Sequence, residues 1–228
     1  MKLSIVIPTL NEARIIKATL AALQPLRRNG VEVIVADGGS DDGTVERSRA
    51  QVDQVCIGAR GRARQMNAGA ALATGEALLF LHADTLLPER ADIDVLSALR
   101  RDHRVWGRFD VRIVGRPRLL PLVAALMNLR SRLTGIATGD QAMFVRREAF
   151  AAVGGFPELE LMEDIALSAR LKQLSWPLCL HRRVTTSGRR WEEHGFWRTV
   201  VLMWWLRLQF FVGQHAAHLA RRYQGMHR

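Results

Sequence analysis

Three short apolar runs in the first third of the chain each end in a cluster of polar residues. The runs cover residues 5–7, 33–35 and 78–81. Continuous apolar runs of this length are typical of buried parallel strands. Ligands of an open parallel sheet bind outside the carboxyl ends of its strands, so we expect the three polar clusters to converge on one site. Their carboxylates and glycines suit a metal-bound ligand that carries phosphate.

Apolar residues at helical spacing predict helices between and after these strands. The first helix is expected from Asn11 to a point near Pro25, where proline should end it. Further helices are predicted over residues 45–52, 68–73 and 88–101, and a short strand over residues 55–57. Residues 105–114 alternate with the period of a strand and should run antiparallel or irregularly. The pattern therefore predicts an α/β fold with a Rossmann-like, mostly parallel mixed sheet flanked by helices.

Two segments of the second half combine apolar and basic residues. Residues 116–134 hold arginines at both ends of a leucine-rich stretch, which predicts a buried helix with basic ends or an interfacial membrane helix. Residues 196–212 are more aromatic, and Arg198 and Arg207 interrupt them. We expect this segment to pack on the domain or to lie in a headgroup layer. No run of eighteen uncharged apolar residues is present, so a spanning helix is not expected.

The length of 228 residues and the 48% hydrophobic content are sufficient for one well-packed domain. We predict a catalytic domain over residues 1–180 and a basic, aromatic helical extension over residues 181–228 that packs on it. The two cysteines, Cys56 and Cys179, lie in apolar sequence, and the chain opens on a strand without a signal peptide. We therefore expect a cytoplasmic protein, with a peripheral position on the inner face of the cell membrane as an open alternative.

The formal net charge of +11 is carried by arginine rather than lysine. Residues 1–57 are balanced, with 7 basic and 7 acidic groups, whereas residues 121–228 carry 15 and 8. Such a basic half suits an anionic membrane surface, a phosphorylated substrate or a nucleic acid. Nucleic acid is not expected, because the arginines are scattered and form neither a basic helix nor an aromatic platform.

The polar clusters after the first two strands are the first candidate site. They contain Pro8, Thr9, Asn11 and Glu12 after the first strand, and Asp37 and Gly38 after the second. Each cluster taken alone also fits a structural role, as a helix cap or as a tight turn. Adjacent parallel strands deliver their ends to one edge, however, and this favours a shared ligand site.

The third cluster is His82-Ala83-Asp84. Alternation in an extended segment would aim His82 and Asp84 the same way. One carboxylate together with diphosphate oxygens and waters is enough to hold Mg²⁺ or Mn²⁺. The structural alternative is a capping aspartate beside a hydrogen-bonded histidine.

Three further groups lie in the second half of the chain. Glu163 and Asp164 open a predicted helix, where acidic residues either interact with the helix dipole or act as a general base. A second group, Gly139, Asp140 and Gln141, could contact a ligand. The loop over residues 185–191 carries Arg189 and Arg190 and could grip phosphate, although a plain basic loop would look the same.

From about Leu3 to Gln173, this ordered set of motifs resembles the family 2 glycosyltransferases of the GT-A fold. The resemblance implies that Thr9, Glu12 and Asp37 hold the nucleoside of the donor. The segment 61–69 is similar to the family's donor loop, with Gly61, Arg62 and Asn67 as its site residues. The family's Asp-x-Asp motif corresponds to residues 82–84.

Within that motif, Asp84 keeps the position of the metal ligand, and His82 replaces the first acid. This departure affects the ribose contact and the metal preference. The family's Glu-Asp pair corresponds to Glu163 and Asp164, and the resemblance makes Asp164 the base of an inverting reaction. Three runs, His-Ala-Asp-Thr, Gly-Asp-Gln and Thr-Ser-Gly-Arg-Arg-Trp, are also similar to a small bacterial branch named for arsenosugar-type biosynthesis.

The resemblance implies transfer of a sugar from a nucleotide diphosphate sugar, with a UDP-sugar as the expected donor, to a hydroxyl acceptor. Mn²⁺ or Mg²⁺ would neutralise the diphosphate together with Arg62 and with Arg189 or Arg190. The acceptor could be a small molecule or lipid-linked, and contact with a membrane and a homodimer both stay open. Two other functions also stay open: a sugar-phosphate nucleotidyltransferase, disfavoured because residues 8–14 lack glycine, and a non-catalytic membrane-surface protein.

Overall fold

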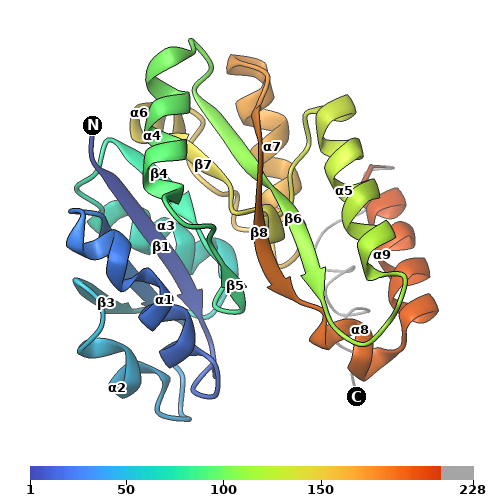
Figure 1. The fold of residues 1–228 in the computed structure, drawn as a ribbon, viewed down its shortest axis with the longest axis horizontal. Coiled ribbons are helices and arrows are strands. Elements are labelled where there is room, and N and C mark those ends of the chain that lie inside the picture. Colours follow the sequence, from blue (N-terminus) through green and yellow to red (C-terminus); the bar gives the residue numbers. More distant parts are fainter. Residues whose placement is uncertain (212–228) are drawn as a thin grey trace.

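The computed structural model describes residues 1–211, except for the side chains of Arg190, His194, Arg207, Leu208, Phe210 and Phe211. An eight-stranded sheet with the order β3-β2-β1-β4-β7-β6-β8-β5 runs through it (Figure 1). The strands are β1 (Leu3–Thr9), β2 (Glu32–Asp37), β3 (Gln54–Ile57), β4 (Ala77–Phe80), β5 (Thr85–Leu86), β6 (Trp106–Val114), β7 (Phe144–Arg146) and β8 (Leu178–Ser187). The helices are α1 (Ile16–Arg28), α2 (Thr44–Arg49), α3 (Arg62–Leu72), α4 (Ala91–Arg101), α5 (Leu120–Thr134), the 3₁₀ helix η1 (Gly139–Gln141), α6 (Arg147–Ala152), α7 (Glu163–Leu174), α8 (Arg189–His194) and α9 (Phe196–Phe211).

Strand directions bring six carboxyl ends to one edge of the sheet. β1 is parallel to β2 and β4, and β2 is parallel to β3. β7 is antiparallel to both of its neighbours, β4 and β6, so β6 has the same direction as β4. β8 is parallel to β6, and β5 is antiparallel to β8. The prediction of a mixed, mostly parallel sheet is confirmed, and the ends of β1, β2, β3, β4, β6 and β8 share one edge.

Alternation along the central strand produces two hydrophobic layers. Leu3, Ile5 and Ile7 of β1 pack with α1 and α4 on one face, and Val6 packs with α3, α6 and α7 on the other. Figure 1 shows α1 and α4 in front of the sheet and α3, α6 and α7 behind it. Each fully buried side chain of this size contributes about 1.5–3 kcal/mol, so the two layers hold the strand ends firmly in place.

Two helix predictions need correction. α1 continues past Pro25 to Arg28, because the buried side chain of Leu26 still packs on the core and Asn29 closes the last turn. α3 begins at Arg62 instead of residue 68, so the predicted donor loop over residues 61–69 is mostly helical. Ala63 and Met66, in its first turns, pack in the core behind the sheet.

The predicted boundary between residues 180 and 181 falls inside β8. This strand pairs with β6 from Leu178 to Ser187, with one irregularity between Phe109 and Asp110. The sheet therefore includes residues that the sequence assigned to the C-terminal extension. α9 packs on the same unit through Leu202 and Leu206, which contact Met162 and Ile165. None of the helices within residues 1–211 is long and apolar enough to cross a membrane.

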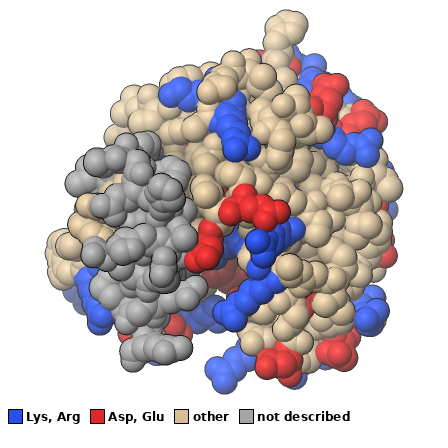
Figure 2. Space-filling model, turned by 180° about the vertical axis from the view of Figure 1, so that it is seen from behind, with Lys and Arg blue, Asp and Glu red and all other residues tan. Residues whose placement is uncertain are grey.

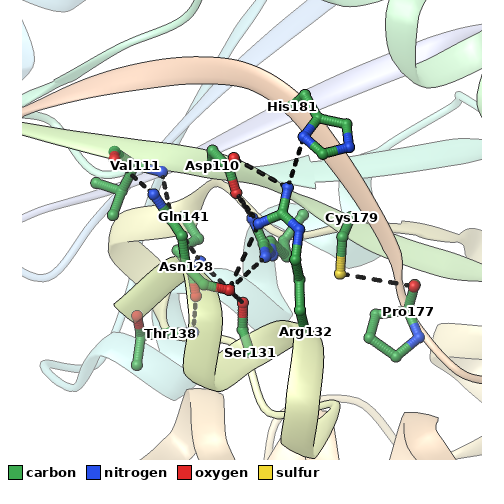
Figure 3. Close-up of polar contacts among 11 residues, drawn as sticks. Asp110, Val111, Asn128, Ser131, Arg132, Thr138, Gln141, Pro177, Cys179 and His181 are labelled. Carbon is green, nitrogen blue, oxygen red and sulfur yellow. Dashed lines mark hydrogen bonds and ion pairs between the residues drawn. The ribbon is translucent and has the colours of Figure 1, made fainter. Parts of the chain in front are cut away.

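A buried polar network fastens α5 and η1 to the sheet. Arg108 of β6 is fully buried; it pairs with Asp110 and donates a hydrogen bond to the carbonyl oxygen of Asn128 in α5 at 3.0 Å. Arg132 of α5 holds both oxygens of Asp110, at 2.6 and 3.0 Å (Figure 3). The Asn128 side chain bonds both backbone groups of Val111 and accepts from Gln141 of η1. Burial raises the pKa of Asp110, but the bonds from Arg132 and Arg108 outweigh burial and hold it below its ordinary value.

We expect Asp110→Asn to destabilise the fold strongly, because it leaves the buried Arg108 guanidinium without its carboxylate. Breaking a buried pair in this way costs about 3–5 kcal/mol. Urea unfolding measures the loss, and Glu158→Gln is the matched control because it breaks the exposed pair with Arg64, worth about 0–1 kcal/mol. Equal losses in the two variants would show that the Arg108 pair does not hold the fold.

Candidate active site

Asp37, at the end of β2, organises the loop that follows it. Its buried carboxylate accepts four hydrogen bonds, from the Thr9 hydroxyl at 2.8 Å, the Gly39 N–H at 2.9 Å, and the Ser40 N–H and hydroxyl at 2.7 and 2.6 Å. A carboxylate offers about four acceptor positions, so all of them are in use. A nucleoside that contacts Asp37 directly must replace one of these bonds.

Gln65 is a site residue that the sequence motifs did not single out. Its buried amide donates to the carbonyl oxygens of Thr9 and Ala36, at 2.5 and 3.1 Å, and so joins the ends of β1 and β2. A Cβ atom on Gly38 would lie 3.1 Å from this amide, which explains the glycine. A signal was available in the small residues Ala68, Gly69 and Ala70, which allow a helix to approach a sheet closely. In the structure a side chain on Gly69 would collide with Val6, and Gln65 lies one turn earlier on the same face of α3.

The loop after β1 places Glu12 at the carboxyl edge of the sheet. Asn11 and Glu12 donate their N–H groups to the Ser40 and Thr44 hydroxyls, at 2.8 and 2.9 Å. The Glu12 carboxylate lies 3.7 Å from the Arg189 guanidinium. Burial raises the pKa of Glu12, Arg189 lowers it, and the nearby Asp84 carboxylate raises it again, with a net increase.

The turn after β4 separates the two polar side chains of the third cluster. The N–H of Thr85 donates to the carbonyl oxygen of His82 at 3.1 Å, so the segment is not extended as the alternation argument required. His82 lies beside Asp140 of η1, with Nδ1 and Oδ1 3.3 Å apart. Asp84 lies close enough to Glu12 to act on its pKa. The two side chains share the edge of the sheet but have different neighbours.

Asp84 is the residue that best fits a divalent cation. Its half-buried carboxylate receives one long hydrogen bond, from the Thr85 hydroxyl at 3.4 Å, and therefore keeps acceptor positions for a metal. A cation beside it would also relieve the repulsion between Asp84 and Glu12. Among the described residues there is no group of three His, Cys, Asp or Glu side chains that could hold a metal. Diphosphate oxygens and water would have to complete the coordination, which is usual for Mg²⁺.

Asp164, at the start of α7, lies against η1. Its Oδ2 accepts the N–H of Gly139 at 2.8 Å, and its Oδ1 accepts the N–H of the next residue, Ile165, at 2.7 Å. A side chain on Gly139 would run into the His82 ring, so glycine is required for this close approach. The bonds fix the Asp164 carboxylate at the same edge as His82 and Asp140.

Glu163 is almost fully buried and forms an ion pair with Arg62, the first residue of α3, at 3.3 Å. Burial raises the pKa of Glu163, Arg62 lowers it and Asp164 raises it, with a net increase. Burial lowers the pKa of Arg62, but Glu163, Asp164 and Asp140 outweigh this effect and raise it. Arg62 is thus the cation of an acidic cluster, and its side chain is 44% exposed and accessible to an anionic ligand.

Three non-glycine residues with positive φ flank these segments. They are Asn11 (φ 56°), Ala142 directly after η1 (φ 45°) and Met162 directly before α7 (φ 66°). Such conformations cost of order 1–3 kcal/mol each and persist where the surrounding structure imposes them. At Met162 and Ala142 the side chains are buried, so packing imposes the strained backbone that presents Glu163, Asp164 and η1.

Several predicted site residues make structural contacts in this chain. Asn67 bonds both backbone groups of Phe156, at 2.8 and 2.9 Å, and Gln141 is fully buried and bonds Ser131 and Asn128. Ala83 is buried, and its carbonyl oxygen accepts the Thr19 hydroxyl. Pro8 lies within β1, and Gly61, with a φ of 137°, is the residue directly before α3. The side chain of Arg190 lies outside the described residues.

The face behind that of Figure 1 is hollowed near its centre. Figure 2 shows acidic and basic side chains around this hollow. α3 and α7 lie on this side of the sheet, so Arg62 and the half-buried Asp164 at their N-termini are available to a ligand that reaches the carboxyl edge from this face.

Solved structures with the same architecture define the class of fold. TarS from S. aureus superposes with a TM-score of 0.61 and 22% identity, covering 82% of this chain and 35% of TarS. The mannosyltransferase PcManGT from Pyrobaculum calidifontis gives 0.59 and 27%, covering 80% of this chain and 56% of that one. Both are GT-A glycosyltransferases, and the fold of this chain is GT-A.

The family profile described as Glycosyl transferase family 2 matches residues 4–154, and the chain therefore belongs to this family. Curated relatives include the PGL/p-HBAD biosynthesis glycosyltransferases of Mycobacterium bovis and Mycobacterium tuberculosis, each 35% identical over 109 residues. The match covers 44% of this chain and 42% of the relatives, so it spans less than half of their length. These relatives do not support the narrower arsenosugar-type branch.

We expect Arg62→Gln to make stability more sensitive to pH. Without Arg62 the pKa of Glu163 rises further, so the folded state binds a proton that the unfolded state, with a pKa of about 4.3, has released. Stability should then fall as the pH rises above about 4.3, the unfolded-state pKa, more steeply than in the wild type. Urea unfolding across this range measures the slope. In the double variant Arg62→Gln/Glu163→Gln, the added pH dependence of the unfolding free energy should disappear. An unchanged pH dependence in Arg62→Gln would contradict the ion pair between Arg62 and Glu163.

Proposed function

We propose that the protein is a metal-dependent, inverting glycosyltransferase that moves a sugar from a nucleotide diphosphate sugar to a hydroxyl acceptor. The observation that carries the proposal is the convergence of two groups at one edge of the sheet. Asp84 and Glu12 supply carboxylate for a cation, and Asp164 supplies a fixed carboxylate beside η1. A transfer reaction needs both a neutralised leaving group and a base.

Asp164 is the proposed general base. One oxygen of its carboxylate, Oδ2, accepts the Gly139 N–H. The Arg62–Glu163 pair involves the residue directly before Asp164. Asp164 would accept the proton of the acceptor hydroxyl as that oxygen attacks the anomeric carbon and the diphosphate leaves. Attack from the face opposite the leaving group inverts the configuration. Glu163 is proposed to support this step by fixing Arg62.

The donor is proposed to lie along the ends of β1, β2 and β4. Thr9, Glu12 and Asp37 line its nucleoside end, and Arg62 and Arg189 are the cations within reach of a diphosphate. A bound Mn²⁺ or Mg²⁺ on Asp84 would supply Lewis-acid neutralisation of the leaving group. The PcManGT structure contains GDP-Man and Mn²⁺, and a TarS structure contains UDP-GlcNAc. A UDP-sugar is the first donor to test here.

We expect Asp164→Asn to lower turnover by about 10²–10⁴-fold while nucleotide binding is retained, since it removes a base and no ligand to the donor. Asparagine can still accept the Gly139 N–H, so the fold at η1 should survive. Steady-state turnover and calorimetric nucleotide binding provide the two readouts. Glu158→Gln, a surface change, is the control, and unaltered turnover in Asp164→Asn would refute the base assignment.

We expect one of UDP, GDP and dTDP to raise the melting temperature only when Mn²⁺ is present. The shift should vanish in Asp84→Ala, which loses the proposed metal ligand, and persist in Glu89→Ala, which removes an exposed carboxylate beyond β5. Thermal unfolding with each nucleotide, with and without Mn²⁺, makes the comparison. No shift with any nucleotide would count against the donor site.

A further inference from the structure

α5 carries a row of leucines that faces away from the protein. The row consists of Leu119, Leu122, Leu126, Leu129 and Leu133, spaced three and four residues apart, and each is between 41% and 70% exposed. The opposite side of the helix, with Leu120, Ala124 and Met127, is packed in the core. The helix is therefore fixed on the sheet by one face and presents a second apolar face outward. An exposed apolar row of this length marks a surface that meets another molecule or a membrane.

An arginine-lined groove adjoins the first turns of this helix. It has a volume of ≈ 520 Å³ and lies between the end of β6 and α5, where Arg112, Arg116, Arg118 and Arg183 border it. None of the described residues that line it is acidic. Arg116 lies 3.7 Å from Glu192 and is 92% exposed, whereas the other three arginines have no ion-pair partner in the described part of the chain. Guanidinium groups gathered in this way suit phosphate oxygens.

We propose that this surface, the α5 leucine row with its arginine groove, docks the protein on a bilayer that contains anionic phospholipid. The groove would receive lipid phosphate groups, and the leucine row would enter the boundary between headgroups and acyl chains. α9 lies at the same end of the molecule (Figure 1) and exposes Trp197 and Trp204, at 69% and 70%. Tryptophan favours such an interface because its ring is apolar and its N–H is polar.

Charge distinguishes this occupant from a second copy of the chain. Residues 111–135 contain no acidic residue, and three of their arginines, Arg112, Arg116 and Arg118, border the groove. A second copy that paired through the same surface would offer these guanidinium groups no carboxylate in either direction. Anionic lipid neutralises them, so the charges favour a membrane over a dimer.

The surface also lies on the active-site edge of the sheet. β6 and β8 end at this edge, and Arg189, directly after β8, reaches Glu12. If the proposed transfer activity holds, docking would present the site to acceptors that reside in or near the bilayer. Docking itself needs neither donor nor metal.

Co-sedimentation with phosphatidylcholine vesicles, with and without phosphatidylglycerol, tests the proposal in the absence of nucleotide. The wild type should bind only the vesicles with phosphatidylglycerol, and added salt should release it. Arg112→Gln/Arg118→Gln/Arg183→Gln should lower the partition coefficient on the order of 100-fold, since each arginine near an anionic surface counts for roughly fivefold. Leu122→Ser/Leu126→Ser should lower it about tenfold.

Two control variants carry matched changes elsewhere on the surface. Arg28→Gln/Arg49→Gln/Arg101→Gln removes the same charge, and Leu72→Ser/Leu174→Ser removes two other exposed leucines. Both should bind within about twofold of the wild type if docking is local to α5. Equal losses in test and control variants would overturn the proposal, as would equal binding to both vesicle types or none to either. A lipid-free dimer that Leu122→Ser/Leu126→Ser dissociates would also overturn it.

Nucleotide binding by the same variants separates this proposal from the proposed function. Vesicle binding without nucleotide binding in the wild type would support docking and contradict the transferase site. Nucleotide binding without vesicle binding would do the reverse.

Discussion

The ion pair between Arg108 and Asp110 determines where the second half of the site lies. A guanidinium inside the sheet is tolerable only with a carboxylate and further acceptors around it. Asp110 of β6 supplies the carboxylate, the Asn128 carbonyl of α5 supplies a further acceptor, and Arg132 of α5 holds Asp110 in place. Asn128 in turn holds the buried Gln141, which ends η1. η1 presents Gly139 to Asp164 and Asp140 to His82. A charge in the core is thus coupled, through one helix, to the carboxylate beside the proposed acceptor.

The two halves of the site are held in different ways. The proposed nucleoside side is fixed by the bonds of Asp37 to Thr9, Gly39 and Ser40 and by Gln65, which spans two strand ends. The proposed acceptor side depends on the pair of Arg62 with Glu163, which lie 101 residues apart, and on the bond of Gly139 to Asp164. The Asp37 bonds can form as soon as β1 and β2 pair. The second half requires the whole sheet, because β7 and β6 must join before η1 has a position.

Much of the fold follows from the sequence, since apolar runs and alternation identify strands without knowledge of their partners. The boundaries that failed were those decided by tertiary packing. Leu26 carries α1 past Pro25, and Ala63 and Met66 start α3 early. In the site, the motifs predicted which segments meet, because parallel strands impose a common edge. They could not predict that Asn67 and Gln141 bond backbone and core groups, or that Arg108 lies buried, since each depends on how α3, α5 and η1 pack on the rest of the fold.

The saturated carboxylate of Asp37 has a consequence for the thermodynamics of donor binding. Its four accepted bonds give the segment over residues 38–40 its shape without any ligand. The conformational entropy of that segment is therefore lost during folding and not at the moment of association. A nucleotide bound at the proposed site would meet a segment whose shape is already fixed, and its affinity would depend on how well it replaces hydrogen bonds that already exist. Discrimination between bases would then arise from the match of hydrogen-bond donors and acceptors, with little contribution from loop closure.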